Sequence, residues 1–402
     1  MLTRLTRSSG TISYIYDSLN RLTNKITPER EVIYGYDTGS RLASATDPDG
    51  EMSYIYDAVN RVKTVTYPDF KVISYDYDGN GNRAKLTYQD LSYITYEYDN
   101  INRLTDIKNS SSQVICHYDY DSLSRRTGKT LLNGTFTNYG YDWINRLTDL
   151  TNTKDTIILS QFSYSIYDKT GNRKAIDTPD GAYAYIYDKT YQLKTADYPA
   201  SSSFPDTIFN YDSVGNRTSV AAGSTISYTP NLLNQYAKVG ATDLIYDNNG
   251  NLTNIATNTY SYDSENRLIT ATTPSHTASY GYDPFGRRIS KTVDGVITKF
   301  LYDGDQIIAE YDGSDNLTAK YVYGAGIDEP IRMEKGGQSY YYHTDGLGSV
   351  TNLTDSTGTV AESYSYDVFG KPSAVSTVGN RYMFTGREYD AETGLYYYRA
   401  RY

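Results

Sequence analysis

The sequence has little of what a disulfide-stapled, membrane-spanning or nucleic-acid-binding protein needs. Cys116 is the single cysteine, so no disulfide can form within the chain. No run of 18 apolar residues occurs, which predicts that the chain does not span a membrane. Acidic residues outnumber basic ones by 48 to 38, the net charge is −10, and no basic stretch stands out. The charge argues against nucleic acid as the main partner.

Tryptophan and phenylalanine are also scarce, with one and nine residues, whereas tyrosine supplies 47 of the 402 residues. Apolar residues make up 38% of the chain, which is below the usual share of about 45–50%. Aromatic and β-branched residues are still plentiful, so the composition does not predict disorder. Because tyrosine combines an apolar ring with a hydroxyl that can face water, it suits the wall of an ordered protein.

The tyrosines recur in a short unit, Tyr-x-Tyr-Asp followed by a turn and then usually Asn-Arg-Leu. The clearest copy runs from Tyr14 to Leu22. In the first 150 residues the second tyrosine of each copy falls at positions 16, 36, 56, 77, 98, 120 and 141. A nearly fixed period of this size indicates a repeat array, which can be long without a domain boundary.

Each unit is expected to form a β-hairpin. Tyr14 and Tyr16 are two residues apart, so they lie on the same face of a strand. Asp17 can end that strand by accepting hydrogen bonds from backbone N–H groups two residues on. Asn20 tolerates the left-handed backbone of a tight reversal. Successive hairpins would then build one long antiparallel sheet.

Aspartate and arginine recur across the predicted turn, most often four residues apart. We expect a clamp in which the arginine binds the aspartate or the loop carbonyls and fixes the register of the hairpin. The step is five residues at 78/83, 168/173 and 212/217, where the same clamp is expected. The repeat motif of the regular array is carried by Tyr16, Asp17, Arg21, Tyr36, Asp37, Arg41, Tyr56, Asp57, Arg61, Tyr98, Asp99, Arg103, Tyr141, Asp142 and Arg146.

The repeat pattern of the sequence changes near residue 300. Units shorten, glycine rises, and a Tyr-His-x-Asp-x-x-Gly-Ser element occupies residues 342–349. A Gly-Leu-Tyr-Tyr-Tyr-Arg-Ala-Arg-Tyr element follows at 394–402. We therefore expect a repeat array over 1–300 and a distinct closing segment over 301–402, with no helical pattern in either.

The repeats resemble the YD repeats of the Rhs family, and residues 301–402 resemble the Rhs repeat-associated core. The family includes bacterial Rhs polymorphic toxins, the C components of Tc toxin complexes, wall-associated toxin proteins and the teneurins. The residues that match the core are His343, Asp345, Gly346, Gly348, Gly386, Arg387, Gly394, Tyr396, Arg399 and Arg401.

The resemblance implies an all-β protein, a long antiparallel sheet that spirals into a hollow shell or part of one. In bacterial members the shell encloses a C-terminal toxin, and the core closes one end. Many members cleave themselves with aspartates beyond the core, past Tyr402 here, so no catalytic residue is assigned and no enzymatic activity is expected. The implied partners are the C-terminal cargo of a longer parent and a secretion machinery. The implied location is outside a bacterial cell or on its surface, with no export signal in this chain.

Alternatives to the shell remain at this stage. Tyrosine ladders can stack on sugars, so a surface adhesin that binds cell-surface glycans is the main rival. Abundant carboxylates leave a glycosidase-type pair open. No cofactor or metal is expected: Asp76-x-Asp78-x-Asn80-Gly81 begins like a calcium loop but has Thr87 where that loop needs a glutamate. His343 with Asp345 is the one histidine pairing that merits attention, and a structural hydrogen bond is favoured for it.

Overall fold

The computed structural model describes residues 3–7 and 10–402, and it is built of strands. The strands are β1 (Arg4–Arg7), β2 (Gly10–Tyr16), β3 (Leu22–Ile26), β4 (Glu31–Tyr36), β5 (Leu42–Asp47), β6 (Gly50–Tyr56), β7 (Val62–Thr66), β8 (Val72–Tyr77), β9 (Arg83–Thr87), β10 (Tyr93–Tyr98), β11 (Leu104–Asn109), β12 (Val114–Tyr120), β13 (Arg126–Leu131), β14 (Thr135–Tyr141), β15 (Leu147–Lys154), β16 (Ile157–Tyr167), β17 (Arg173–Thr178), β18 (Gly181–Tyr187), β19 (Leu193–Asp197), β20 (Thr207–Tyr211), β21 (Arg217–Ala222), β22 (Ser224–Pro230), β23 (Tyr236–Val239), β24 (Thr242–Tyr246), β25 (Leu252–Ile255), β26 (Asn258–Tyr262), β27 (Leu268–Thr272), β28 (Thr277–Tyr282), β29 (Arg288–Val293), β30 (Val296–Asp303), β31 (Gln306–Asp312), β32 (Leu317–Tyr323), β33 (Pro330–Lys335), β34 (Gln338–Thr344), β35 (Val350–Thr354), β36 (Val360–Ser363), β37 (Glu388–Asp390) and β38 (Leu395–Tyr397). The helical element is a single 3-10 turn, η1 (Phe384–Gly386). Among the described residues, no helix is long and apolar enough to cross a membrane.

Each YD unit folds as the sequence predicts. In the first copy, the N–H of Asn20 donates to the carbonyl of Asp17 at 3.0 Å, and Asn20 has a left-handed φ of 63°. The register shifts by one residue between Ile15 and Tyr16, which pairs with Leu22. This is a tight turn followed by a left-handed residue and a bulge, a common way to close a hairpin.

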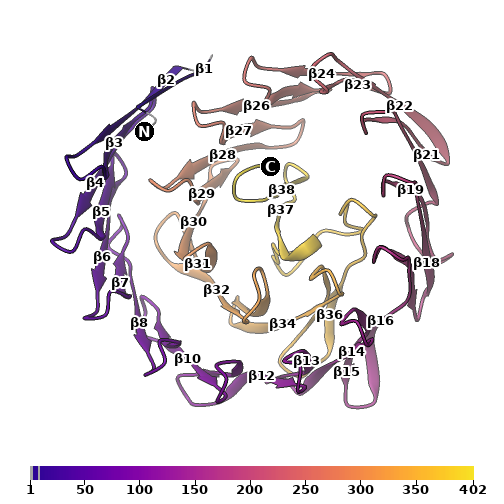
Figure 1. Cartoon of the computed structure of the whole chain (residues 1–402), viewed down its shortest axis with the longest axis horizontal. Helices are drawn as coiled ribbons and strands as arrows, with labels where there is room; N and C mark the ends of the chain where they lie inside the picture. Colours follow the sequence, from indigo (N-terminus) through magenta and orange to yellow (C-terminus); the bar gives the residue numbers. More distant parts are fainter. Residues whose placement is uncertain (1–2, 8–9) are drawn as a thin grey trace.

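Strands β1 to β36 form one antiparallel sheet in which consecutive strands pair. Figure 1 shows that the sheet winds inward. We call residues 3–255 the outer coil, residues 258–363 the inner coil and residues 364–402 the terminal segment. The outer coil runs around the periphery, the inner coil lies inside it, and the terminal segment occupies the centre (Figure 1). Over the described residues β1 and β36 are not paired, so the sheet is a spiral with two free ends.

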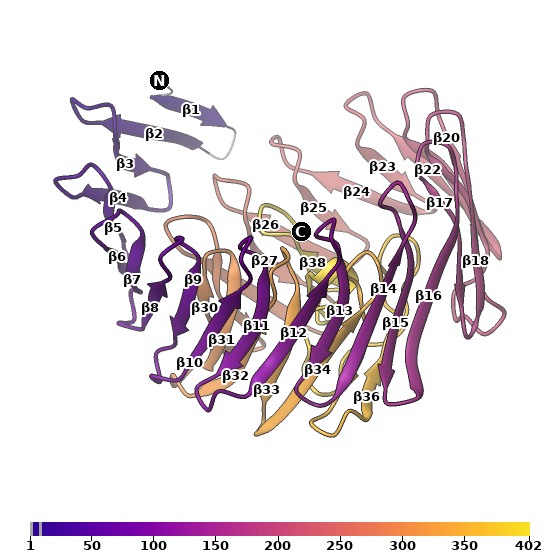
Figure 2. The ribbon, with the colours of Figure 1, turned by 60° about the horizontal axis from the view of Figure 1, so that its bottom comes forward.

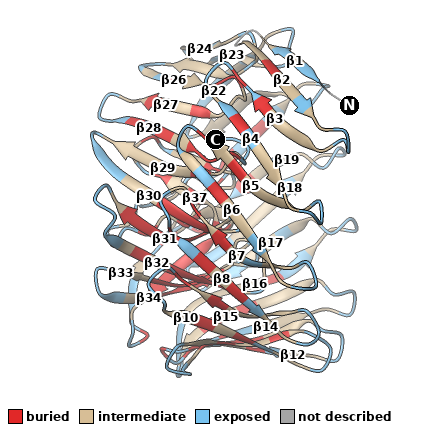
Figure 3. Cartoon of the chain, turned by 90° about the vertical axis from the view of Figure 1, so that its left-hand side faces the viewer, coloured by how far each residue is buried: buried red, intermediate tan, exposed pale blue. Residues whose placement is uncertain are grey.

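The main hydrophobic core lies between the two coils. Met52, Ile73 and Ile107 of the outer coil belong to the same buried cluster as Tyr321 and Tyr342 of the inner coil. Figure 3 shows buried residues on β7 and β8 of the outer coil and on β27 and β31 of the inner coil. Strands β22–β25 contain no buried residue and form a single-layered arc at one side (Figure 2). Burial therefore follows the overlap of the coils.

The expected all-β spiral is confirmed, and the inner coil and the terminal segment pack inside part of the outer coil. One pocket lined by described residues, between the outer coil and the terminal part of the chain, measures about 610 Å³. That is the size of a small-molecule site. A folded domain of 100 residues has a radius of gyration of about 13 Å and would not fit. The sheet also continues without a break across residue 300, where β30 pairs with both neighbours.

Candidate functional site

The clamp between aspartate and arginine closes each regular turn. The Oδ1 atom of Asp17 accepts hydrogen bonds from the N–H groups of Leu19 at 2.9 Å and Arg21 at 3.0 Å. Its Oδ2 atom accepts from Nε of Arg21 at 2.8 Å. The N–H of Arg21, helped by the guanidinium, lowers the pKa of Asp17. The same pairs form at Asp37/Arg41, Asp57/Arg61, Asp99/Arg103, Asp121/Arg125, Asp142/Arg146, Asp263/Arg267 and Asp283/Arg287.

The clamp expected at the five-residue steps is wrong. In these turns an asparagine stands four residues after the aspartate, and Nδ2 of Asn82 donates to Oδ2 of Asp78 at 2.9 Å. Arg83 instead forms an ion pair with Asp303 of the inner coil. Side chains alternate along a strand, so a residue five after the aspartate takes the inward position that Leu104 holds elsewhere. Arg173 and Arg217 stack on aromatic rings rather than clamping turns.

A second clamp joins each repeat to the next, and the sequence analysis missed it. The guanidinium of Arg21 lies over the ring of Tyr36 at 4.5 Å. The hydroxyl of Tyr36 donates to the carbonyl of Leu22 at 2.8 Å. The same tyrosine-to-backbone bond is made by Tyr56, Tyr77, Tyr98, Tyr120, Tyr141, Tyr167, Tyr187, Tyr211, Tyr282, Tyr302, Tyr323 and Tyr366. The second tyrosine of the motif is therefore a joint between repeats.

The turns of the inner coil dock on the inner face of the outer coil. The first docked turn follows Asp263: the hydroxyl of Ser264 donates to Glu29 at 2.6 Å, and Lys25 pairs with Glu265 at 2.9 Å. In the next turn, the ring of Phe285 packs against the rings of two outer-coil tyrosines, Tyr34 and Tyr54, with centroids 6.4 and 6.2 Å apart.

Later turns continue the same docking. The carboxylate of Glu329 pairs with Arg126, whose charge, against the opposing effect of burial, holds the pKa of Glu329 below its usual value. The N–H of Val368 donates to the hydroxyl of Tyr198 at 3.0 Å, and Phe369 packs on Phe209 with centroids 5.3 Å apart. The turns between residues 263 and 369, in the inner coil and the start of the terminal segment, thus contact residues 25–209 of the outer coil.

The Tyr-His-x-Asp-x-x-Gly-Ser element forms one of these turns. Asp345 accepts hydrogen bonds from the N–H groups of Leu347 and Ser349, and Gly348 has a left-handed φ of 83°. The N–H of Gly346 donates to the hydroxyl of Tyr164 at 2.7 Å. The element is therefore a docking turn of the same kind as the repeats.

His343 does not bind Asp345. It is fully buried, and its Nε2 lies 2.9 Å from Oγ1 of Thr354. Burial lowers its pKa to about 3, so the imidazole is neutral at neutral pH. The contact that His343 makes is a structural hydrogen bond to Thr354.

The remaining core residues fold the terminal segment. Both Arg387 and Arg399 form ion pairs with Asp328 of the inner coil. Gly386 has a φ of 68°, and a Cβ there would lie 2.3 Å from the carbonyl oxygen of Asp328. The N–H of Gly394 donates to Asp390, the hydroxyl of Tyr396 donates to the carbonyl of Gly370, and Arg401 is exposed.

A buried charge network fixes the terminal segment to the inner coil. Arg288 is 0% exposed and pairs with both Glu388 and Asp390. Nearby, Arg381 pairs with Glu310 at 2.7 Å and with Glu388 at 3.0 Å. Arg288 lies five residues after Asp283, at the inward position of its turn, but nothing in the local sequence identifies Glu388 and Asp390 as its partners.

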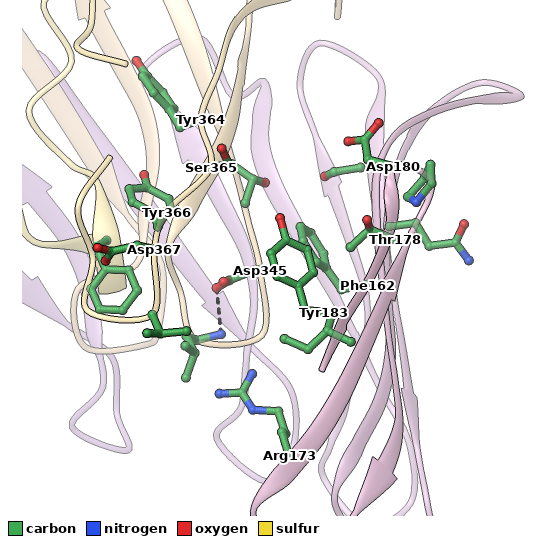
Figure 4. Close-up of a pocket in the computed structure, with 18 of the residues that line it drawn as sticks. Phe162, Arg173, Thr178, Asp180, Tyr183, Asp345, Tyr364, Ser365, Tyr366 and Asp367 are labelled. Atoms are coloured by element: carbon green, nitrogen blue, oxygen red, sulfur yellow. Dashed lines mark hydrogen bonds between the residues drawn. The ribbon is translucent and has the colours of Figure 1, made fainter. Parts of the chain in front are cut away.

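The 610 Å³ cavity opens between the wall formed by the outer coil and the Tyr-His-x-Asp-x-x-Gly-Ser element, which we call the core element (Figure 4). Phe162 of β16, Arg173 of β17 and Tyr183 of β18 line it from the wall. Asp345 and Asp367 line it from the opposite side, at the ends of two docking turns. In Figure 4 the guanidinium of Arg173 points toward Asp345, but the two form no ion pair. Burial raises the pKa of Asp345. Within the described residues no group of three or more His, Cys, Asp or Glu side chains could hold a metal.

Comparison with known proteins shows which family has this architecture. The teneurin YD-shell family profile matches residues 3–165 and 169–401. Over 208 residues the chain is 38% identical to the tRNA3(Ser)-specific nuclease WapA of Bacillus spizizenii, covering 48% of this chain and 9% of that protein. It is 24% identical to the double-stranded DNA deaminase toxin A of Burkholderia cenocepacia, covering 58% of this chain and 19% of the toxin.

The solved structures share the fold. A crystal structure of TcdB2-TccC3-TEV superimposes with a TM-score of 0.75 at 16% identity, covering 97% of this chain and 25% of that one. A Tc holotoxin pore from Photorhabdus luminescens gives a TM-score of 0.74 at 17% identity, with the same coverage. The chain thus spans about a tenth of the curated nuclease and a quarter of the solved chains.

Proposed function

Because this chain belongs to the teneurin YD-shell family, we propose that it is the closing end of a β-shell that holds a C-terminal polypeptide cargo. The observation that carries the proposal is the inward winding of residues 258–402, which pack against the inner face of part of the outer coil (Figure 1). A spiral that narrows until it packs on itself makes a sealed end. Residues 301–402 supply most of the seal.

The position of Tyr402 supports a cargo that begins inside the wall. Its ring packs on Tyr280 and Tyr397, with centroids 5.2 Å apart in each case, and its hydroxyl accepts from Arg288 at 3.0 Å. A polypeptide continuing from this residue would start on the inner side of the coils. Since the cavity here is too small for a domain, the room for cargo would come from wider coils of a longer parent.

The role we propose for this chain is structural, as a wall rather than an enzyme, and bacterial secretion is the setting that its relatives suggest. The toxic activities in the names of the relatives belong to those proteins. The repeat tyrosines are engaged with arginines and backbone carbonyls, which favours a wall over an open, tyrosine-lined adhesive face.

Proteolysis tests the proposal on the chain itself. An identical short, unstructured tag with a protease site would be placed either before Met1 or after Tyr402. We expect the tag after Tyr402 to be cut much more slowly, because its first residues are shielded by the coils. Arg288→Met, which loosens the terminal segment, should remove the difference. Equal cleavage of the two tags in the unmodified chain would refute an inward-facing C-terminus.

A further inference from the structure

The cavity between the outer coil and the core element contains a buried polar group that no described residue satisfies. Asn352 of β35 is 6% exposed, and its Nδ2 donates to Oγ of Ser363 at 2.9 Å. Its Oδ1 atom has no hydrogen-bond partner, although Asn352 lines the cavity. A buried acceptor without a partner costs about 1–3 kcal/mol. The Oδ1 atom is itself buried, so a ligand in the cavity that donated a hydrogen bond to it after a small rotation of the amide would recover that free energy.

Other polar groups at the cavity are also only partly used. Within the described chain, the carboxylate of Asp180 has no hydrogen-bond or ion-pair partner, and Asp367 uses only its Oδ1 atom, for the N–H groups of Phe369 and Lys371. The guanidinium of Arg173 lies over the ring of Tyr164 at 5.2 Å and pairs with no carboxylate there. The cavity therefore offers both acceptors and a donor to a ligand.

Aromatic rings supply its apolar surface. Phe162 and Tyr183 line the outer side and Phe384 the inner side. In Figure 4 the ring of Tyr183 stands beside Asp345, in front of Phe162. A ligand here would meet ring faces and hydrogen-bonding side chains together. The volume of about 610 Å³ lies within the range of about 300–1,000 Å³ for small-ligand sites.

These groups select among ligand classes. An anion would be repelled by Asp345, Asp367 and Asp180, whereas a hydroxyl-rich ligand can use these carboxylates and the guanidinium of Arg173 together. Extended peptides usually bind through backbone pairing at a sheet edge, but β16 and β17 are paired on both sides. A hydroxyl group can accept from Arg173 and donate to a carboxylate or to Asn352. Neutral ligands with many hydroxyls and apolar ring faces satisfy all these conditions.

We propose that this cavity binds a short, uncharged oligosaccharide. Tyr183 and Phe162 stack on its rings, Arg173 donates to its hydroxyls, and Asn352 and Asp180 accept from them. This site is separate from the proposed shell, because it lies between the coils and needs no cargo. It also differs from a tyrosine ladder, since most repeat tyrosines are committed to the wall.

The test uses the full chain with chitotriose, cellotriose and maltotriose at millimolar concentration. Saturation-transfer NMR would detect contact, and calorimetry would give the dissociation constant. We expect at least one trisaccharide to bind saturably. Tyr183→Ala and Asn352→Leu should each weaken binding about ten-fold or more, since a ten-fold change corresponds to about 1.4 kcal/mol.

Two further variants separate binding from folding. Asp180 is exposed, and its carboxylate has no partner among the described residues, so Asp180→Asn should weaken binding while leaving the melting temperature unchanged. Tyr228→Ala is the matched control, because Tyr228 is a half-buried sheet tyrosine that does not line the cavity. The proposal is overturned if no trisaccharide binds, if Asp180→Asn and Asn352→Leu leave binding intact, or if an uncharged Gly/Ser/Ala peptide binds in place of the sugars.

Discussion

The hydroxyl of Tyr36 donates to the carbonyl of Leu22 at 2.8 Å, one repeat earlier in the chain. The ring carrying that hydroxyl is covered by the arginine of the same earlier repeat, at 4.5 Å. Each hairpin is therefore tied to its predecessor by a polar and an aromatic contact as well as by the strand ladder. Repeat proteins gain their stability from such nearest-neighbour interfaces.

Tyr56→Phe tests this joint. The change removes the bond from the hydroxyl of Tyr56 to the carbonyl of Leu42 while keeping the ring under Arg41. We expect a loss of about 0.5–1.5 kcal/mol in the free energy of unfolding, measured by urea denaturation. Tyr191→Phe is the control, because the exposed hydroxyl of Tyr191 has no partner in the described chain. Equal effects of the two changes would mean that the joint contributes nothing.

Arg288→Met tests the buried charge network. The change leaves Glu388 without its partner on the inner coil and Asp390 with Lys291 alone. Removing one partner from a buried ion pair typically costs about 3–5 kcal/mol. We expect faster amide hydrogen exchange throughout residues 380–402 in the variant. The exposed Arg401, changed in the same way, should leave the exchange rates unchanged, and unaltered exchange in Arg288→Met would contradict the proposed anchoring.

Two buried groups predict loss of stability in acid. The pKa of His343 falls from an ordinary 6.5 to about 3 through burial, so the unfolded chain takes up its proton first and stability declines as pH falls from 6.5 toward 3. Arg381 and Lys335, against the opposing effect of burial, lower the pKa of Glu310 from 4.5 to about 2, so its contribution is lost between those values.

The two groups can be told apart by their pH windows. His343→Gln should flatten the dependence of the urea midpoint on pH between 6.5 and 4.5, where Glu310 stays charged. The variant should keep the steeper decline at lower pH. If His343→Gln leaves the pH dependence of the urea midpoint unchanged from pH 6.5 to 4.5, His343 is not buried as described.

Gly386→Ala tests the close approach of the terminal segment to the inner coil. The new Cβ would lie 2.3 Å from the carbonyl oxygen of Asp328, at a φ of 68°. Gly337→Ala has a similar φ of 73° but meets nothing within 4 Å. The control should cost about 1 kcal/mol from backbone strain alone. Gly386→Ala should lower the melting temperature distinctly further, and equal shifts would show that the contact yields easily.

The hairpins could be predicted because their causes are local. Asp17, Asn20 and the paired tyrosines act within one turn, and the repeat shows the same chemistry many times. The five-residue copies misled the prediction because the asparagine in the clamp position was read as loop. The spacing of Arg21 and Tyr36 held a signal for the joint between repeats, since in the regular array the clamp arginine precedes the second tyrosine of the next pair by 15 to 17 residues in most copies.

The overlap of the coils could not be predicted from local causes. Arg287 and Arg288 are neighbours, yet one clamps a turn and the other lies buried against Glu388 and Asp390. Alternation along the strand turns Arg288 inward, but which residues it meets there depends on how far the sheet curves before the terminal segment returns. The curvature of the sheet is the sum of small twists over many strands, so it cannot be read from any single residue.

The unequal lengths of the two coils have a consequence for how such a chain can change. The turns between residues 263 and 369 contact the inner face of residues 25–209 one after another. Adding one repeat to the inner coil would displace every later turn from the outer-coil residues that it contacts. Adding one repeat to the single-layered arc of β22–β25 would leave all of these contacts between the coils in register. Variation in repeat number should therefore collect in that arc.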